Sequence, residues 1–448
     1  MRKIADYQLT LSFQPIKRRN SRKWHRISEI LDANPEIADL VRRDLTTRKD
    51  GSQANDTGAD GMTGDHALRF AIVKMCEGLS YRKLADRVDD SIILRAFCRV
   101  EFTKVPAFTT LNDNIKKLRP DTLKAINDII MLYAKERKIE TGRQTRIDTT
   151  AVEANIHYPR DSRQLWDSVR VITRILKGIA SDHPELDFHF HDHTRSAKKL
   201  LYNISNARGM KKRKPLYRKL LKIARKTVGY GGQTVAMLRA LKLELEITTT
   251  LAEVRRLGQA VIEQTERRVL YGESVPAQEK VLSIFESHVD VIVKGQREPT
   301  YGHKVCITSG KSNLILDCQI FRGNPADTDE FIPALERHEK LYGRVPLKVA
   351  TDGGFTSKDN ANDAKEMGVR DIAFSSLKGN KLSDLIKSER VYKKLRKWRA
   401  GIEGIISAAK RAYGLSRCNW SSFESFKAYV HLGVLAFNLT MLARHLLN

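Results

Sequence analysis

The hydrophobic pattern of this chain changes its period near residue 145, and this change constrains the fold more than any other feature. Upstream, apolar residues recur at helical spacing, as in the segment 122–136. Downstream, short runs of β-branched and aromatic residues alternate with helical patterns. In chain order the pattern predicts a strand (145–152), a hairpin (302–321), a helix (329–342), a strand (347–351), a helix (357–367), a strand (371–375) and a helix (394–413).

The interval between the first strand and the hairpin is too long to be a loop. It carries helical patterns at 163–179, 194–206, 215–227 and 234–270, so we interpret it as a helical insertion into an α/β core. The expected fold class is therefore α/β. The expected parts are an N-terminal all-α domain (1–140), a split core (141–157 and 296–416), the insertion (158–295) and a C-terminal helix (417–448).

The net charge of the chain predicts a polyanionic partner. Lysine and arginine number 80 against 53 acidic residues, which gives a formal charge of +27, and nucleic acid is the commonest partner of so basic a protein. An anionic membrane is the competing partner. The apolar C-terminal stretch is interrupted by Asn438, Arg444 and His445, which favours a packed helix over a membrane span. We expect DNA as the partner, no membrane, and a cytoplasmic location.

The positive charge is concentrated in the insertion. Residues 195–226 include thirteen lysines or arginines and no acidic residue. A charge run is usually a solvated surface, but this one spans two predicted helices and the loop between them without one balancing acid. We expect it to contact DNA phosphates, with the loop residues Lys211, Lys212, Arg213 and Lys214 at its centre.

Cysteine and histidine give weaker signals. The five cysteines are an odd number and no two form a CxxC pair, so we expect reduced core thiols rather than disulfides or a zinc knuckle. His189, His191 and His193 alternate along one segment. A zinc site is possible chemically, but alternate residues of an extended segment make a poor tetrahedron, and a loop before a helix is the favoured interpretation.

Three acidic residues stand where predicted elements could bring them together. Asp148 lies within the first predicted strand, and Asp352 ends a later strand and precedes Gly353 and Gly354. Ligands of open α/β sheets gather at strand ends, although an exposed strand residue or a turn aspartate is the alternative for either position. Glu403 lies on the last predicted helix of the core.

The face of that helix is unusual. At 100° per residue, Arg396, Arg399, Glu403 and Lys410 fall within about 60° of one another, beside an apolar face. A simple surface pair between Arg399 and Glu403 is the alternative. Gly401 and Gly404 weaken helix propensity and fall on another face, where a second backbone or DNA could come close.

These segments resemble the three acidic motifs of the DDE transposases of bacterial insertion sequences. The segments are 147–150, 351–355 and 399–404, and Arg399, Glu403 and Lys410 fit the arginine–glutamate–lysine part of the third motif. The aromatic position of that motif is Arg396 here, so the aromatic residue is absent or replaced by Tyr392 or Trp398. The segment 79–84 resembles the family's N-terminal DNA-binding region, and 324–327 resembles the loop after its hairpin.

The resemblance implies a fold and a chemistry. The fold is an RNase H-like mixed sheet with an N-terminal DNA-binding domain, and the long insertion marks a subgroup. Asp148, Asp352 and Glu403 would bind two Mg²⁺ ions, for which Mn²⁺ would substitute, and Arg399, Lys410 and Arg396 would contact DNA. The enzyme would nick the ends of the element at its terminal inverted repeats and join them to double-stranded target DNA, as a homodimer.

Two other functions remain open at this point. A nuclease or resolvase on the same fold would cut DNA without joining it. A DNA-binding protein descended from a transposase would do neither, although the presence of all three acids argues against this alternative.

Overall fold

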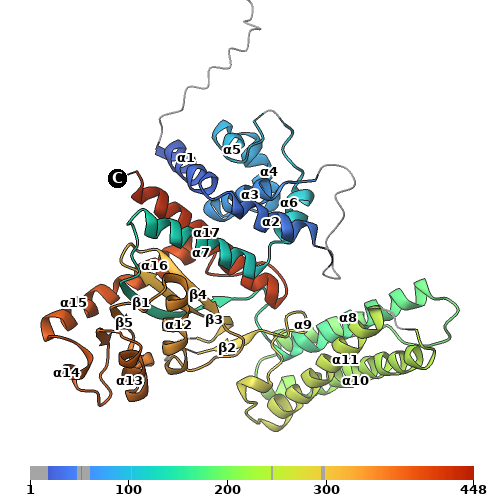
Figure 1. Ribbon diagram of the computed structural model, residues 1–448. Coiled ribbons are helices and arrows are strands. Elements are labelled where there is room, and N and C mark those ends of the chain that lie inside the picture. The colour runs from blue at the N-terminus through green and yellow to red at the C-terminus, as the bar shows by residue number, and fades with distance from the viewer. Residues whose placement is uncertain are drawn as a thin grey trace, which may run out of the picture.

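The computed structural model describes residues 19–47, 52, 61–101, 103–243, 246–293 and 298–447. A mixed sheet forms the centre of the molecule, and one group of helices next to it contains both the first helices of the chain and the last one (Figure 1). A bundle of long helices projects to the side of the sheet. Three hydrophobic clusters correspond to this arrangement, one shared by the terminal helices and the sheet, one in the bundle and one in the rest of the sheet.

The N-terminal helices begin and end at residues whose side chains suit those positions. Thr63 and Ser80 accept hydrogen bonds from the backbone N–H groups of His66 and Lys83, which is the usual N-cap contact. Gly78 ends a helix with φ of 63°, a conformation that favours glycine. The helices are α1 (Arg19–Asp32), α2 (Glu36–Thr46), α3 (Gly64–Glu77), α4 (Tyr81–Asp89), α5 (Ile92–Phe97), α6 (Phe108–Ile115) and α7 (Pro120–Glu136).

The last helix, α17 (Phe423–His445), is the core of this helical group. It packs against α7, α3 and α1, and its residues belong to the same hydrophobic cluster as theirs. Among the described helices it alone is long and apolar enough to cross a membrane, but 89% of its most apolar 18-residue window is buried inside the protein. The prediction of a packed terminal helix therefore agrees with the structure.

The sheet has six strands in the order β2-β3-β1-β5-β6, with β4 also pairing to β3. β1 runs antiparallel to β3 and parallel to β5, and β5 runs parallel to β6. The prediction of a mixed sheet in an α/β protein is thus confirmed. The strands are β1 (Gln144–Glu153), β2 (Asp290–Ile292), β3 (Thr300–Gly310), β4 (Ile315–Ile320), β5 (Lys348–Thr351) and β6 (Asp371–Phe374).

Helices that follow the hairpin pack around β4, β5 and β6. Ser357 caps one of them by accepting a hydrogen bond from Asn360 N, and α15 lies against β5 and β6. The helix predicted at 394–413 is in fact two helices that meet at Ala400. The elements are α12 (Phe331–Tyr342), α13 (Lys358–Glu366), α14 (Leu382–Leu385), α15 (Glu389–Arg399) and α16 (Gly401–Ala412), with 3-10 turns η3 (Thr328–Glu330) and η4 (Gly353–Phe355).

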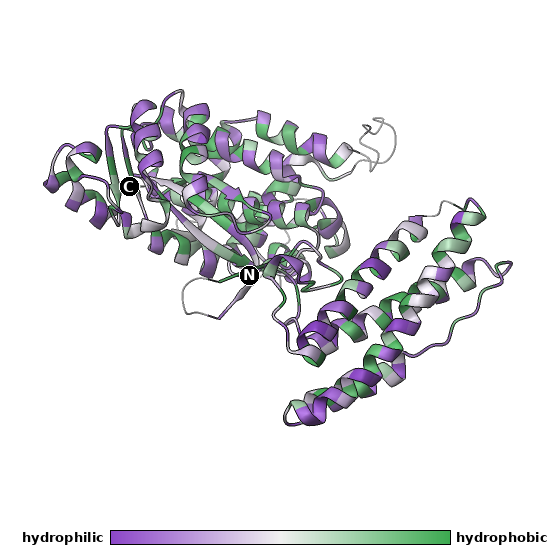
Figure 2. Ribbon diagram, turned by 90° about the horizontal axis from the view of Figure 1, so that it is seen from below, coloured by the Kyte–Doolittle hydropathy of each residue, from purple (hydrophilic) through white to green (hydrophobic). Residues whose placement is uncertain are grey.

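The insertion forms a bundle with its own core, which stands apart from the sheet (Figure 2). The helices predicted at 215–227 and 234–270 were wrongly divided, because one helix runs from Met210 to Ala240. Gly231 lies inside this helix. A Cβ atom added to it would lie 3.3 Å from Ile172 Cγ2 and 3.5 Å from Leu251 Cδ1, so this glycine allows close helix packing and does not end the helix. The elements are α8 (Asp161–Asp182), α9 (Thr194–Asn206), α10 (Met210–Ala240), α11 (Glu246–Thr265), the π-helix η1 (Glu266–Tyr271) and the 3-10 turn η2 (Ala277–Glu279).

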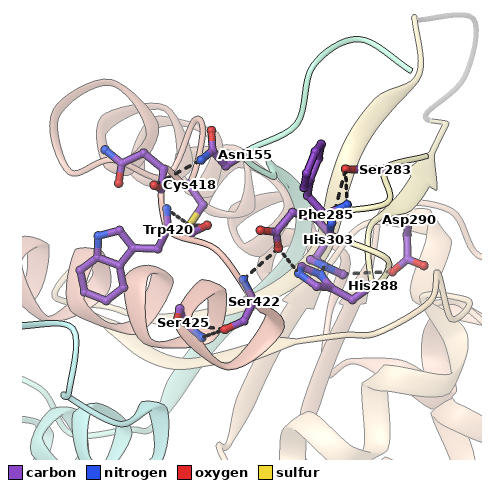
Figure 3. Close-up of polar contacts among 12 residues, drawn as sticks. Asn155, Ser283, Phe285, His288, Asp290, His303, Cys418, Trp420, Ser422 and Ser425 are labelled. Carbon is purple, nitrogen blue, oxygen red and sulfur yellow. Dashed lines mark hydrogen bonds and ion pairs between the residues drawn. The ribbon is translucent and has the colours of Figure 1, made fainter. Parts of the chain in front are cut away.

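A chain of buried polar groups ties the returning end of the insertion to the sheet (Figure 3). His288 Nδ1 lies 2.7 Å from His303 Nε2 on β3, and His288 Nε2 lies 2.7 Å from Glu286 Oε2. His303 Nδ1 lies 3.0 Å from Asp290 Oδ2. Glu286 Oε2 also accepts a hydrogen bond from Ser422 N, directly before α17. The same chain of contacts therefore holds three separate segments together.

Candidate active site

Asp148 and Asp352 lie side by side where two parallel strands meet. Ile147 of β1 is opposite Thr351 of β5, so the next residue along each strand is an aspartate. Each Oδ1 atom accepts a hydrogen bond of 2.7 Å from the backbone N–H of the following residue, Thr149 or Gly353. These local contacts hold the two carboxylates and leave both Oδ2 atoms facing Arg399.

Glu403 reaches the same place from the first turn of α16. Arg399, the last residue of α15, lies between the three acids. Its Nη2 atom is 2.9 Å from Asp148 Oδ2 and 3.7 Å from Asp352 Oδ2, and its Nη1 atom is 3.7 Å from Glu403 Oε1. Three acids from three distant parts of the sequence are thus gathered around one guanidinium group.

The acids and Arg399 line a cavity of about 680 Å³. Asp148 and Arg399 are nearly buried, with 14% and 15% of their side chains exposed, whereas Glu403 is 71% exposed. Arg399 Nε has no hydrogen-bond partner among the described residues. Lys410 also lines the cavity, and so do Glu298 and Arg411, which the sequence gave no reason to single out.

The chemistry of the donor set suits a hard divalent cation, because carboxylate oxygens are its preferred protein ligands. The present arrangement is held by Arg399 instead, and no three acidic, histidine or cysteine side chains in the described parts of the chain are grouped closely enough to hold one ion as they stand. The residues therefore fit a metal by type, and the guanidinium would have to move for them to hold it.

Gly354, the second residue after Asp352, leaves room for a neighbouring side chain. A Cβ atom on Gly354 would lie 2.6 Å from Asp327 Oδ2, so a side chain and not a ligand takes that space. Asp327 in turn pairs with Lys304 at 2.6 Å and accepts a hydrogen bond of 3.0 Å from Thr149 Oγ1. Although Asp327 precedes η3, its side chain makes no capping hydrogen bond to that turn. Asp327 instead supports the backbone next to Asp148.

Neither aromatic candidate for the third motif lines the cavity. Tyr392 is buried and donates its hydroxyl hydrogen to Phe374 O at 2.8 Å. Trp398 is half-buried under Arg146, whose guanidinium carbon lies 4.6 Å from the ring centroid. Arg396 is exposed, stacks on Tyr392 and also lies outside the set of residues that line the cavity.

The basic residues of the insertion lie outside the cavity, at the start of α10. Lys211 and Lys212 are exposed. Arg213 and Lys214 are half-buried and donate hydrogen bonds to backbone carbonyls, of Ala207 at 2.8 Å and of Leu270 at 3.1 Å. The last two residues therefore stabilise the bundle in addition to adding charge.

The alternating histidines do not converge on a common point. His189 is exposed, and the rings of His191 and His193 lie against each other with centroids 4.5 Å apart. Burial and the neighbouring His191 and Lys226 lower the pKa of His193. The segment precedes α9 as a loop, in agreement with the favoured interpretation.

Acids that converge from neighbouring strands of a mixed sheet and from an adjacent helix are an arrangement suited to metal-dependent phosphoryl transfer. Residues 291–439 match the family described as the transposase DDE domain, and residues 13–117 match a second family described as a transposase domain (DUF772). No curated protein and no solved structure matches the chain. Asp352 and Glu403 fall within the DDE match, and Asp148 lies before it.

The chain belongs to the DDE transposases, of the type carried by insertion sequences. It is an enzyme that cleaves DNA and transfers the cut strand in transposition. Members of this family bind DNA, typically use divalent metal ions and have an RNase H-like core.

Proposed function

We propose that Asp148, Asp352 and Glu403 are the catalytic acids of this transposase and that they hold two Mg²⁺ ions, which Mn²⁺ can replace. The observation that carries the proposal is the convergence of these acids on Arg399, within 3.7 Å or less. Two divalent ions, when bound, stabilise the attacking and leaving oxygens of a phosphoryl transfer. The remaining chemistry belongs to the residues of the chain.

Arg399 has two successive roles in this proposal. Before DNA binds, its guanidinium neutralises the three neighbouring carboxylates, whose mutual repulsion would otherwise separate them. When a DNA phosphate enters the cavity, the guanidinium can turn to it, because Arg binds phosphate through two parallel hydrogen bonds. Its unpaired Nε supplies a further donor. Lys410, on the same wall of the cavity, adds a point charge for the phosphate.

The DNA substrates are the terminal inverted repeats of an element and a double-stranded target. The segment 79–84 includes the start of α4, whose Arg82 stacks on Phe108 at 4.6 Å. We assign the recognition of the repeats to the helical domain 1–140, and contact with flanking phosphates to the insertion through Lys211 and Lys212 and to α15 through Arg396. Exposed lysines and arginines add affinity that falls with salt.

The proposed division of the chain follows these tasks. Residues 141–157 and 296–416 form the split RNase H-like core, residues 158–295 form the basic insertion, and residues 417–448 form the C-terminal helix. We further propose a homodimer on DNA, because two ends must be cut and joined together, and a location in the bacterial cytoplasm at the nucleoid.

Substitution of Glu403 by glutamine tests the assignment of the acids. The Glu403→Gln protein is expected to bind a labelled end with unchanged affinity in a gel-shift assay and to lose Mg²⁺-dependent nicking. The matched control is Glu424→Gln on α17, an exposed glutamate that pairs with Lys427. Full nicking by the Glu403 variant would remove that residue from the site. An assay with pre-cut ends separates strand transfer from simple cutting.

A further inference from the structure

A fully buried arginine lies beneath the acidic site. Arg146 is 2% exposed and lies two residues before Asp148 on β1, so both side chains leave the same face of the strand. Its Nε donates to Ser309 Oγ at 2.9 Å, Nη1 to Trp398 O at 2.7 Å and Nη2 to Asn313 Oδ1 at 2.5 Å. The side chain therefore links β1, the β3–β4 hairpin and the end of α15.

The burial of Arg146 lowers the stability of the folded protein. All three of its described hydrogen bonds end on neutral oxygens, and a buried cation without a carboxylate partner destabilises a protein. Burial lowers the pKa of Arg146 to about 10, so the side chain is still charged at neutral pH. An apolar residue would fill the same space with less cost in desolvation. A function in the neighbouring site would account for keeping the charge.

The contact with Trp398 O coincides with the break between α15 and α16. Trp398 is next to Arg399, and its carbonyl accepts the backbone N–H of Ala400 at the end of α15 as well as Arg146 Nη1. The guanidinium thus binds the last turn of α15, and it also stacks on the Trp398 ring. A Cβ atom on Gly401 would lie 2.5 Å from Arg146 Nη1, so the first residue of α16 must lack a side chain for this contact to exist.

We infer that Arg146 is a positioning residue for the reaction. Its hydrogen bond to Trp398 O connects the end of α15 to β1, the strand that carries Asp148. This contact sets the distances of Arg399 and Glu403 from Asp148. The inference rests on the proposed role of the three acids in metal binding. Gly401 contributes to the same positioning, because the absence of a side chain there leaves the space that the Arg146 guanidinium occupies.

Two substitutions and one control isolate this role. Arg146→Met removes the three hydrogen bonds. Gly401→Ala keeps the arginine but forces Nη1 away from Trp398 O. Gly404→Ala adds the same methyl group to the same helix where nothing lies within 4 Å, and so provides the matched control. Both alanine variants add one methyl group to a glycine of α16, and only the one at position 401 meets Arg146, so a loss confined to Gly401→Ala reports that contact.

The main readout is backbone cleavage by hydroxyl radicals from Fe²⁺ bound in place of Mg²⁺, which maps the segments near the ion without DNA or turnover. The wild-type protein and Gly404→Ala should be cut near positions 148, 352 and 403. Arg146→Met and Gly401→Ala should keep the first two cuts and show a weaker third cut relative to them. Their nicking rates should fall on the order of 10–100-fold with end binding unchanged, since a displacement of about 1 Å can cost that much.

The outcomes separate this inference from the proposed function. Uniform cutting at all three positions in folded Arg146→Met or Gly401→Ala protein would overturn the positioning role and leave the metal site intact. Absence of these cuts in the wild-type protein would overturn the metal site and the positioning role together. If Arg146→Met does not fold, Gly401→Ala alone decides, because its single added methyl group keeps every hydrogen-bonding side chain of the wild-type protein.

Discussion

Arg399 Nη2 lies 2.9 Å from Asp148 Oδ2, which makes this arginine the immediate neighbour of the proposed first catalytic acid. The pair joins the end of α15 to the middle of β1, residues separated by most of the core and the whole insertion in sequence. A metal ion and the guanidinium would compete for the same carboxylate oxygens. The affinity of the site for metal is therefore coupled to the position of Arg399.

This competition gives a first prediction, for Arg399→Ala. Without DNA the variant should bind Mn²⁺ roughly ten-fold more tightly, because a hydrogen bond to a charged group contributes about 1.5–3 kcal/mol and about 1.4 kcal/mol corresponds to a factor of ten. Nicking should nevertheless be lost, since the phosphate contact is gone. Titration calorimetry with Mn²⁺ measures the affinity. Arg396→Ala, on the same helix but outside the cavity, should not change it, and equal affinities for all three proteins would contradict the competition.

A second prediction concerns the support beneath Asp148. Gly354→Ala should displace Asp327, whose Oδ2 lies 2.6 Å from the added Cβ, and so disturb its contacts with Lys304 and Thr149. The nicking rate should fall at least ten-fold with little loss of end binding, on the order of the cost of a misplaced group. Gly229→Ala, on α10 with nothing within 4 Å of the new methyl group, is the control. A fully active Gly354→Ala enzyme would show that Asp327 has no part in holding the site.

A third prediction concerns Glu286, whose contacts with His288 and Ser422 N connect the insertion to the sheet and to α17. Burial alone would raise the pKa of Glu286, but hydrogen bonds from His288, Ser422 N and Ser421 outweigh it and lower the pKa below its ordinary value of 4.5. A lowered folded pKa stabilises the protein above 4.5, and this contribution is lost as the pH falls through the folded value. Glu286→Gln should therefore lower the free energy of unfolding most at pH 7, and its effect should become smaller as the pH falls below 4.5.

Urea unfolding at several pH values measures this difference. Glu279→Gln serves as the control, because Glu279 is 55% exposed and pairs only with the exposed Arg267 in the described contacts. A difference between wild type and Glu286→Gln that stays constant from pH 7 to pH 3 would be incompatible with the lowered pKa of Glu286.

A fourth prediction concerns the contact between α17 and the sheet. Asn438 is fully buried and bonds both backbone groups of Ile315 on β4, at 2.8 and 2.7 Å, as well as Asn127 Oδ1 on α7. Asn438→Ala leaves these groups buried without partners, at a cost of about 1–3 kcal/mol for each unsatisfied group. We expect the free energy of unfolding to fall by roughly 3 kcal/mol or more. Asn206→Ala, an exposed contact at the end of α9, should change it by less than about 0.5 kcal/mol.

Local signals in the sequence predicted much of the fold. Ser80, Ser357 and Gly78 act at the helix ends that their residue types suggested, because capping depends on neighbours a few residues away. The strand that carries Asp148 and the strand that ends before Asp352 were also predicted nearly to their bounds. That these two strands pair was implied only by the resemblance to the family, and the structure shows the pairing.

Features that depend on distant contacts could not be predicted in this way. The break at Ala400 is stabilised by Arg146, 252 residues before the carbonyl that it binds. Gly231 resembles a helix end in sequence, but it lies inside a helix because a neighbouring helix packs against it. The position of Arg399 among three acids likewise depends on the folded sheet and not on spacing along one helix.

The shared core of the first helices and α17 has a consequence for synthesis of the protein. Domains near the start of a chain usually fold while translation continues. Here α7 lacks its main packing partner, and α3 lacks one of its two largest, until α17 has been synthesised. A polypeptide that stops before α17 would therefore have neither a finished N-terminal helical group nor a supported β4, and it would not be competent to mobilise an element.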